Sequence, residues 1–301
     1  MAVSEFYFAW ERVIMLMLQS HMGPFAAALM SFITLFGEEA VLVVLVAVIY
    51  WGLDKELGER MGINILISVC ICPLIKNLFL RYRPYFVVPG IRCIKPAREG
   101  DMYDIALQGY SFPSGHACGS AAAYGTLAQS SRNKAVKAGC ILLIALICIS
   151  RVCLGVHFPT DVLAGEVIGT AVILLNSVLM RSERSRKAVL LGIIVLFSAG
   201  LFYCRTEDYF TGYGVLTGGF AGMMFEKKHV KFENTSSAAR ILFRTLGGTA
   251  VFLAVSMLLK GAFGLAAPEG YAALLLRTVR YCVSSFAAVG VYPMAFRLER
   301  N

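Results

Sequence analysis

Long apolar runs separated by short polar connections make up most of the chain. About 20 consecutive apolar residues in a helix span the hydrocarbon core of a bilayer, so such runs predict membrane-spanning helices. A shorter glycine-rich run at 212–225 is a weaker candidate. The longer runs cover approximately 30–51, 61–80, 114–130, 135–155, 160–180, 188–204, 241–260 and 272–296. The pattern predicts an all-α, polytopic transmembrane helical bundle.

The first part of the chain has a different pattern. Residues 1–22 mix Glu5, Glu11 and Arg12 with aromatic and aliphatic side chains, which is typical of a helix that lies in the membrane interface. We therefore predict a single membrane domain in three parts. These are an N-terminal interfacial helix (1–29), a six-span core (30–204) and about three additional C-terminal spans (205–301). The start of the chain lacks the basic and apolar pattern of a signal peptide, so we expect the spans themselves to direct insertion.

Composition agrees with a membrane protein and excludes an ordinary soluble enzyme. Hydrophobic residues make up 58% of the chain, charged residues 16%, and the mean hydropathy is +0.69, whereas soluble domains are about 45–50% apolar and about 25% charged. The net charge is +9, but no basic stripe with interleaved aromatic residues indicates nucleic-acid binding. We expect the positive charge to serve cytoplasmic loops and an anionic ligand. Most of the nine cysteines lie in apolar runs, where they are expected to act as small buried hydrophobes.

Loop charge predicts the orientation of the bundle. The loops at 52–60, 131–137, 181–187 and 226–240 lie on one side, and those at 81–113, 151–159, 205–211 and 261–270 lie on the other. The first side carries more Lys and Arg, and cytoplasmic loops are enriched in these residues. We therefore expect the loops at 81–113 and 151–159 to face away from the cytoplasm.

Three clusters of polar residues lie at helix ends on this non-cytoplasmic side. Because they share one face of the bundle, helix packing can bring them together. The clusters are Lys76-x6-Arg83-Pro84, Pro113-Ser114-Gly115-His116 and Ser150-Arg151-x5-His157-x3-Asp161.

The first cluster is suited to binding phosphate. Lys76 and Arg83 are seven residues apart, so on one helix they would point the same way, and Pro84 would turn the chain out of the membrane. Arg83 offers a planar fork for phosphate oxygens, and Lys76 offers a mobile point charge. The alternative is that both are ordinary cations reaching from a helix end to the interface.

The second cluster opens a predicted helix. Free backbone N–H groups and the helix dipole favour an anion at such a start. Gly115 permits close backbone approach, Ser114 adds a hydroxyl donor, and His116 could protonate a leaving oxygen. The alternative is a common Pro-Ser helix start with an incidental histidine.

The third cluster pairs an imidazole with a carboxylate. His157 and Asp161 are four residues apart around the predicted start of the 160–180 helix. A carboxylate on one ring nitrogen fixes the tautomer and leaves the other nitrogen free to attack. The pair could instead merely connect two helices. We find no carboxylate cluster that could hold a metal ion beside the phosphate, so charge neutralisation is expected from Lys76, Arg83 and Arg151.

Together, the three clusters resemble the type-2 phosphatidic-acid phosphatase (lipid phosphate phosphatase) superfamily, whose motif residues they match in order over residues 76–161. The resemblance implies hydrolysis of a phosphomonoester or pyrophosphate with no metal or other cofactor. It implies that His157 attacks phosphorus to form a phosphohistidine, that Asp161 orients His157, and that His116 protonates the leaving group. The phosphoryl oxygens would be held by Lys76, Arg83, Ser114, Gly115 and Arg151.

The resemblance also implies the setting. We expect a phosphorylated lipid as substrate, membrane lipids as surroundings, and a bacterial cytoplasmic membrane with the site facing outward. The part after residue 204 also resembles the nine-span glucose-6-phosphatase branch, so a soluble sugar phosphate is the alternative substrate. A non-catalytic relative that binds or transports phospholipids is an alternative of another class. The additional spans could form a homodimer face or a wall along which lipid enters.

Two further features have open interpretations. Glu166 lies inside the 160–180 run, and we favour a structural role there over a place at the substrate cleft. The aromatic residues that flank the predicted site could form an interfacial belt or a wall that grips a lipid chain. They are Tyr82, Tyr85, Phe86, Tyr110 and Phe112.

Overall fold

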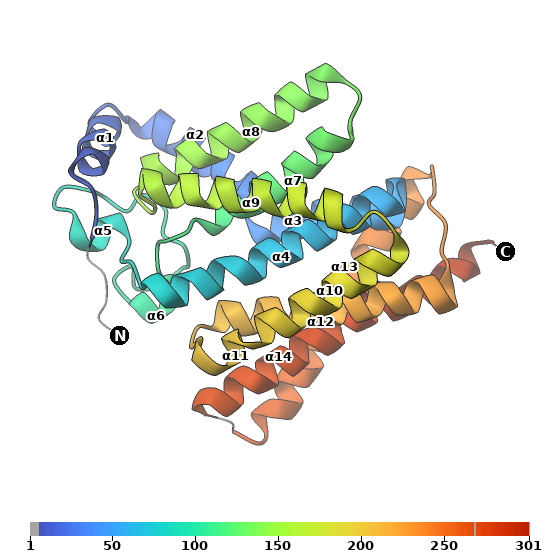
Figure 1. Ribbon diagram of the computed structural model, residues 1–301. Coiled ribbons are helices and arrows are strands. Elements are labelled where there is room, and N and C mark those ends of the chain that lie inside the picture. Colours follow the sequence, from blue (N-terminus) through green and yellow to red (C-terminus); the bar gives the residue numbers. More distant parts are fainter. Residues whose placement is uncertain (1–5, 268, 301) are drawn as a thin grey trace. The chain divides into compact units, whose positions relative to one another are not determined.

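The computed structural model describes residues 6–267 and 269–300 and, of residues 297–300, the backbone only. These residues form helices joined by loops, with no β-strand among them (Figure 1). The chain divides into two compact units, Met1–Leu42 with Ile71–Asn176 and Val43–Cys70 with Ser177–Asn301. The boundaries between these units differ from the predicted boundaries at 29 and 204. The division into three parts stays a prediction.

The predicted all-α polytopic bundle is confirmed. In the described part of the chain, six helices are long and apolar enough to cross a membrane, or seven if the bent pair Ala9–Ser20 and Pro24–Gly37 counts as one span. The chain is therefore an integral membrane protein. The six are α4 (Lys55–Phe79), α8 (Lys134–Cys153), α9 (Pro159–Leu179), Glu183–Tyr203, α13 (Ala238–Gly264) and Gly270–Phe296.

The first unit contains the polar clusters. Helices α7 and α8 form a hairpin in it (Figure 1). Gly165 and Gly169 of α9 face α7 so closely that a Cβ atom on Gly165 would lie 2.5 Å from the Ser114 carbonyl oxygen. The unit also holds the end of α4 and the start of α3 (Glu39–Val48), together with α1 (Ala9–Ser20), α2 (Pro24–Ile33), η1 (Thr34–Gly37), α5 (Pro84–Val87), α6 (Ile105–Gln108), α7 (Gly115–Ser130), α8 and most of α9.

One predicted helix is wrong as a continuous element. The run at 30–51 breaks where α2 tightens into the 3₁₀ turn η1 and Glu38 adopts an extended conformation (φ −72°, ψ 141°) before α3 begins. An apolar run records which side chains avoid water, whether in the protein core or facing lipid, and it does not record where the backbone leaves helical geometry. Here the break places the backbone of Gly37 against His116, since a Cβ atom on Gly37 would lie 3.3 Å from the His116 ring.

The remaining apolar runs form helices, some with shifted ends. The run at 61–80 starts earlier, at Lys55, and 212–225 lies within the longer α12 (Glu207–Phe225). Helix α7 has 16 residues and falls short of the span length. Helix α1 turns sharply into α2, with a bend of 117° between Ala9–Ser20 and Pro24–Gly37. The interfacial placement of residues 1–22 stays a prediction, and Glu5 lies outside the described residues.

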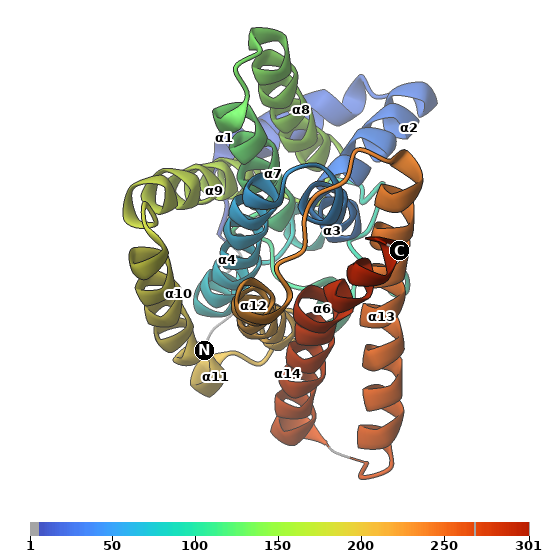
Figure 2. The ribbon, with the colours of Figure 1, turned by 90° about the vertical axis from the view of Figure 1, so that its right-hand side faces the viewer.

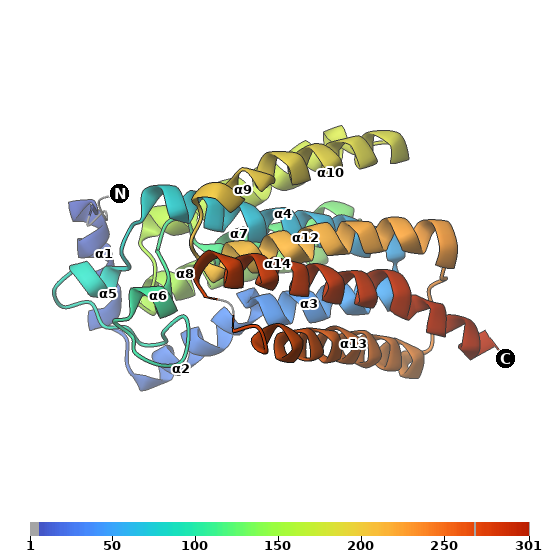
Figure 3. The same cartoon turned by 90° about the horizontal axis from the view of Figure 1, so that it is seen from below.

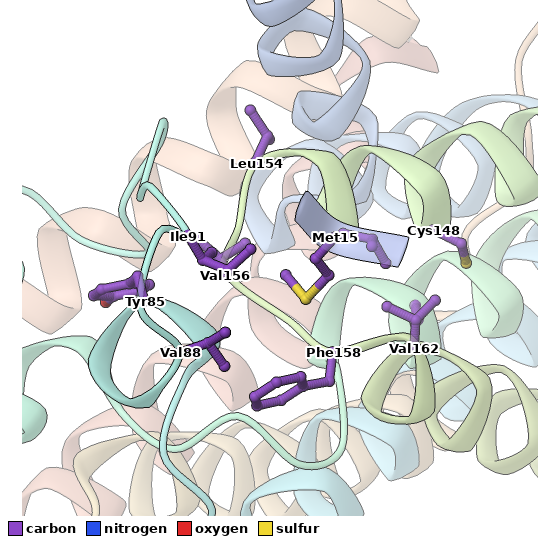
Figure 4. Packing of buried hydrophobic residues seen from close by; sticks show 11 residues of the cluster. Met15, Tyr85, Val88, Ile91, Cys148, Leu154, Val156, Phe158 and Val162 are labelled. Carbon is purple, nitrogen blue, oxygen red and sulfur yellow. The ribbon is translucent and has the colours of Figure 1, made fainter. Parts of the chain in front are cut away.

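A hydrophobic cluster in the first unit fixes the segment before α9. Figure 4 shows Met15 of α1 among Val88, Val156 and Phe158. Met15, Val156 and Phe158 are all fully buried. Because interiors are close-packed, side chains in such a cluster have little freedom. The residues on both sides of His157 are therefore held in place by packing.

The second unit is a separate helical bundle. Helices α13 and α14 (Gly270–Phe286) lie side by side (Figure 2), and α12 runs along α14 (Figure 3). Gly214, Gly218 and Gly222 of α12 have backbone or side-chain atoms of the segment 278–290 directly against them, and small residues at this spacing allow close helix packing in membranes. The unit also contains most of α3 and α4, η2 (Ile49–Leu53), α10 (Glu183–Ser198), α11 (Gly200–Tyr203), η3 (Glu226–Val230), α13, η4 (Ala287–Val291) and η5 (Tyr292–Arg300).

Candidate active site

The three polar clusters meet in the first unit. The second and third are joined by the Ser114 N–H, which donates to the backbone carbonyl of Asp161 at 2.9 Å. The first and third are joined by Arg83, whose Nη1 lies 3.5 Å from His157 Nε2. Segments far apart in the sequence thus form one site, as their shared side of the predicted bundle implied.

His157 is the centre of this arrangement. Its side chain is 2% exposed, and its Nδ1 lies 3.6 Å from Asp161 Oδ2, while Nε2 faces Arg83. Burial lowers the pKa of His157 well below its usual value, and the nearby cations Arg83, Arg151 and Lys76 lower it further. The neutral imidazole is favoured for both reasons. Nδ1 also lies 3.4 Å from the Ser111 hydroxyl oxygen. In the tautomer that carries its proton on Nδ1, the free lone pair is on Nε2, beside a guanidinium.

Arg83 reaches the site by a route that the sequence did not predict. The prediction that Lys76 and Arg83 share one helix face is wrong, because α4 ends at Phe79, Leu80 is left-handed (φ 48°), and Arg83 is extended before α5. Pro84 starts α5, where its missing N–H costs no hydrogen bond. The Arg83 guanidinium donates to the carbonyls of Gln108 at 2.7 Å and Val156 at 3.0 Å. Backbone acceptors therefore hold it in a fixed position.

The start of α7 differs in one detail from the predicted anion site. Ser114 is the N-cap, its Oγ accepts from the Ala117 N–H at 3.5 Å, and its own N–H is used by Asp161. The Ser114 hydroxyl therefore has a proton to donate, but its amide is occupied. At Gly115, which is exposed, an added Cβ would meet nothing within 4 Å. This open space fits the close approach of a ligand that the sequence predicted.

Two polar groups beside His157 lack partners among the described residues. They are His116 Nε2 and Arg151 Nε, both buried. Arg151 also donates from Nη1 to Thr34 Oγ1 at 2.8 Å, and its charge acts on His116. Buried polar atoms in proteins nearly always have a hydrogen-bond partner. These two nitrogens are therefore candidates to contact a ligand oxygen.

Sequence reasoning missed the residues that hold Asp161. The Ser111 hydroxyl donates to Asp161 Oδ2, and Arg81 donates to Asp161 Oδ1 at 2.7 Å. Arg81 also pairs with Glu11. In the sequence, Arg81 is one of the charges of the 81–113 loop, and Glu11 is one of the charges mixed with apolar residues in 1–22. A usable signal was present, because a carboxylate among apolar residues in one segment needs a cation elsewhere.

The other predicted features have definite places in the structure. Glu166 accepts a hydrogen bond from Cys148 of α8 at 3.1 Å, which agrees with the structural interpretation. The nine cysteines all lie among the described residues and form no disulfide with one another, and all except Cys93 and Cys282 are buried. Tyr82 and Phe86 stack with ring centroids 5.6 Å apart. Whether the aromatic residues form a belt or a wall for lipid stays a prediction.

Comparison with known proteins assigns the family. Residues 60–185 match the family model described as PAP2 superfamily, and residues 210–300 match the one described as PAP2 superfamily phosphatase, transmembrane extension. The chain belongs to the PAP2 superfamily. The first match contains all three polar clusters, and the second covers most of the predicted additional spans. The resemblance of the three polar clusters to this superfamily is thereby confirmed.

Two individual relatives extend this comparison. The PAP2 chain is 28% identical over 143 residues to an undecaprenyl-diphosphatase from Sulfolobus acidocaldarius, an alignment that covers 47% of this chain and 65% of that protein. The crystal structure of Aquifex aeolicus LpxE superimposes with a TM-score of 0.51 and 23% sequence identity. This similarity of fold covers 58% of the present chain and 98% of LpxE.

Proposed function

We propose that this protein is an integral membrane phosphatase that hydrolyses a lipid phosphate or lipid pyrophosphate through a phosphohistidine on His157. The observation that carries the proposal is the surroundings of His157. One ring nitrogen faces the Asp161 carboxylate at 3.6 Å, and the other faces the Arg83 guanidinium at 3.5 Å. An oriented neutral imidazole beside a fixed cation is suited to attack a phosphoryl group.

In the first step, His157 Nε2 attacks phosphorus and the bond from phosphorus to the leaving oxygen breaks. Burial and the nearby cations lower the pKa of His116 well below its usual value, so the bound substrate must bring the proton, as a phosphate monoanion. His116 takes up this proton and donates it to the departing oxygen, which leaves as an alcohol or as a lipid monophosphate. The Nδ1–H of His157 keeps its direction toward Asp161, so the developing positive charge on the ring is balanced. General-acid catalysis of this kind contributes about 10²–10⁴ in rate.

In the second step, water attacks the phosphorus of the phosphohistidine. His116, now neutral, accepts a proton from that water, and the bond from phosphorus to Nε2 breaks to release inorganic phosphate. Lys76, Arg83 and Arg151 hold the phosphoryl oxygens, with the Ser114 hydroxyl and the Gly115 amide. All three cations influence the His157 ring, so the charge of the phosphoryl group is neutralised by protein side chains, without a metal ion.

The substrate class follows from the membrane setting and the relatives. The protein is embedded in the membrane, and one relative is an undecaprenyl-diphosphatase. Both support a phosphorylated lipid over a soluble sugar phosphate. The greater number of Lys and Arg residues in the loops on the opposite side supports a site that faces away from the cytoplasm.

The test is phosphate release by the purified protein in detergent with EDTA. Lipid monophosphates, a polyprenyl diphosphate and glucose 6-phosphate form the panel, and vanadate should inhibit because it resembles pentacoordinate phosphorus. His157→Ala should lose nearly all turnover, and a phosphorylated protein should be trapped in the wild type but not in this variant. Near-normal turnover of His157→Ala would show that His157 is not the nucleophile. A requirement for Mg²⁺ contradicts metal-free hydrolysis, and preference for glucose 6-phosphate favours the sugar-phosphate alternative.

A further inference from the structure

A buried chain of charges runs from helix α1 to the candidate site. Arg81 Nη2 donates to Glu11 Oε2 at 2.8 Å, and Arg81 Nη1 donates to Asp161 Oδ1 at 2.7 Å. Glu11 and Asp161 are fully buried and Arg81 is 6% exposed. The guanidinium also lies over the Phe158 ring, 4.1 Å from its centroid. Buried charges are tolerated when they are paired and fully hydrogen-bonded, and these three meet that condition.

Besides its ion pair with Arg81, Glu11 binds the segment of Asp161 directly, through Thr160. Its Oε1 accepts from the Thr160 N–H at 3.1 Å and from the Thr160 hydroxyl at 2.5 Å. Thr160 directly precedes Asp161 in the first turn of α9. Its hydroxyl oxygen also accepts from Arg81 at 2.7 Å. Glu11 therefore fixes both the cation that binds the carboxylate and the backbone that carries it.

These contacts decide which way the Asp161 carboxylate points. Oδ1 is occupied by Arg81, while Oδ2 accepts from the Ser111 hydroxyl and from the Phe158 N–H at 2.7 Å. With its donors fixed on both oxygens, the carboxylate cannot rotate without breaking hydrogen bonds. Its Oδ2 is the atom that faces His157 Nδ1. Partners behind the group that orients an imidazole commonly control ring orientation and basicity.

We infer that Glu11 and Arg81 are positioning residues that act through Asp161 to orient His157 and to set its basicity. The inference rests on the proposed function, in which His157 is the nucleophile. It gives α1 a part in catalysis, because the carboxylate at the outer end of the chain of charges comes from that helix. Neither residue touches the reacting atoms, and neither belongs to the three motif clusters.

The charges predict opposite effects for the two residues. Burial favours the protonated form of the Asp161 carboxyl group and Arg81 favours the ionised form, so Arg81→Gln makes this group easier to protonate. At pH values where Asp161 stays ionised, its full negative charge faces His157 in this variant, and the pKa of His157 rises. Glu11→Gln removes the competing carboxylate, Arg81 then neutralises Asp161 more fully, and the pKa of His157 falls. The other charged or titratable groups that face His157 are Arg83, Arg151, Lys76 and His116, and all stay in place in both variants.

The experiment compares Glu11→Gln, Arg81→Gln and Arg81→Lys with wild type in the same lipid-phosphate assay. We expect kcat to fall about 10–100-fold, the range found for partners behind ligating histidines, with KM changed by less than about threefold, since the groups that bind phosphate are intact. The acidic limb of the pH profile should move to higher pH in Arg81→Gln and to lower pH in Glu11→Gln. Arg81→Lys, which keeps the charge, should recover part of kcat.

The control is Arg12→Gln, an exposed charge next to Glu11 on α1.

The outcomes separate this inference from the proposed function. If wild type is active, His157→Ala is inactive and the Glu11 and Arg81 variants keep the wild-type kcat and pH profile, the two residues are merely structural and the inference is wrong. If His157→Ala is active, the proposed function fails first. Should the charged variants not fold, Thr160→Val removes one hydroxyl and no charge. A fall in its kcat with unchanged KM supports the inference, and wild-type kinetics overturn it.

Discussion

At the scale of single residues, burial and charge together would prepare His157 for its proposed role as nucleophile. Protonated imidazole has no lone pair on Nε2, so a nucleophilic histidine must be neutral in the free enzyme. Burial and the cations Arg83, Arg151 and Lys76 all lower the pKa of His157. The cations proposed to bind phosphate therefore also keep the attacking nitrogen unprotonated, and one set of charges serves both purposes.

This arrangement predicts a titration that can be measured directly. In ¹⁵N-histidine-labelled protein, the ring nitrogens of His157 should report a neutral imidazole below the ordinary histidine pKa of about 6.5. His157→Gln assigns the signal among the four histidines of the chain. Lys76→Met removes one cation, so the His157 signal should then titrate at higher pH than in wild type. A His157 that becomes charged at or above the ordinary value contradicts this account of the site.

Gly37 is a second residue whose importance is visible only in the structure. A Cβ atom there would lie 2.8 Å from Ile147 Cγ2 and 3.3 Å from the His116 ring, so Gly37→Ala should displace His116. Misplacement of a catalytic group by about 1 Å can cost about 10²-fold in rate. We expect the loss to be greater for alkyl than for aryl phosphates, because a poor leaving group depends more on the acid. Gly23→Ala, where a Cβ meets nothing within 4 Å, is the control, and equal losses for both substrates would contradict the role of His116.

The residues of the site divide into those that the sequence could predict and those that it could not. His157 and His116 could be proposed because their chemistry and spacing are local. Arg81 and Glu11 could not, because their meaning depends on a contact between segments 70 residues apart. A single sequence shows that a buried charge needs a partner, but it does not show which partner packing supplies.

At the scale of elements, close contact between α7 and α9 holds two clusters in register. Gly165 allows it, since a Cβ atom there would lie 2.5 Å from the Ser114 carbonyl oxygen and 2.9 Å from Ala117 Cβ. The neighbouring bond from the Ser114 N–H to the Asp161 carbonyl spans 2.9 Å. The separation of these two helices therefore sets the distance between the start of α7 and the His157–Asp161 pair.

Gly165→Ala should push α7 and α9 apart. Overpacking of this kind costs about 1–3 kcal/mol, so thermal stability should fall, and kcat should fall with it because Ser114 and Asp161 separate. Gly139→Ala on α8 is the matched control, because a Cβ there meets nothing within 4 Å, and helical Gly→Ala changes favour the helix by about 0.5–1 kcal/mol. Thermal melting and phosphate release of both variants check the prediction. Wild-type stability of Gly165→Ala would show that the interface yields at no cost.

Helix lengths were the most predictable property of the fold, and breaks were the least. The run at 135–155 corresponds closely to α8 (Lys134–Cys153), because lipid demands apolar residues throughout a spanning helix. A hydropathy average hides two changes of the backbone. One is the break at Glu38, although Glu38 and Glu39 interrupt the apolar run there, and the other is the end of α4 before Arg83, where the residues stay apolar, aromatic or cationic. Backbone geometry at these points is decided by contacts with the site, which a hydropathy pattern does not record.

At the scale of the whole molecule, the orientation in the membrane decides from which leaflet the site can take its substrate. Ile94 of the loop at 88–104 donates to the Leu154 carbonyl at the C-terminal end of α8, whereas the α7–α8 connection adjoins the N-terminal end of α8. The proposed orientation puts the loop and the site outside and the connection in the cytoplasm, since the Lys and Arg counts are higher on the latter side. A lipid phosphate would then be hydrolysed in the outer leaflet.

Labelling of single added cysteines tests this orientation. Glu99 and Arg132 are exposed, one in each connection, and Cys93→Ser removes the half-buried native thiol nearby. In intact cells, a membrane-impermeant maleimide should label Glu99→Cys and should label Arg132→Cys only after permeabilisation. The Cys93→Ser parent gives the background from the remaining cysteines, and retained phosphatase activity shows that each variant is folded. The reverse labelling pattern would place the site in the cytoplasm, and the substrate would then have to come from the inner leaflet.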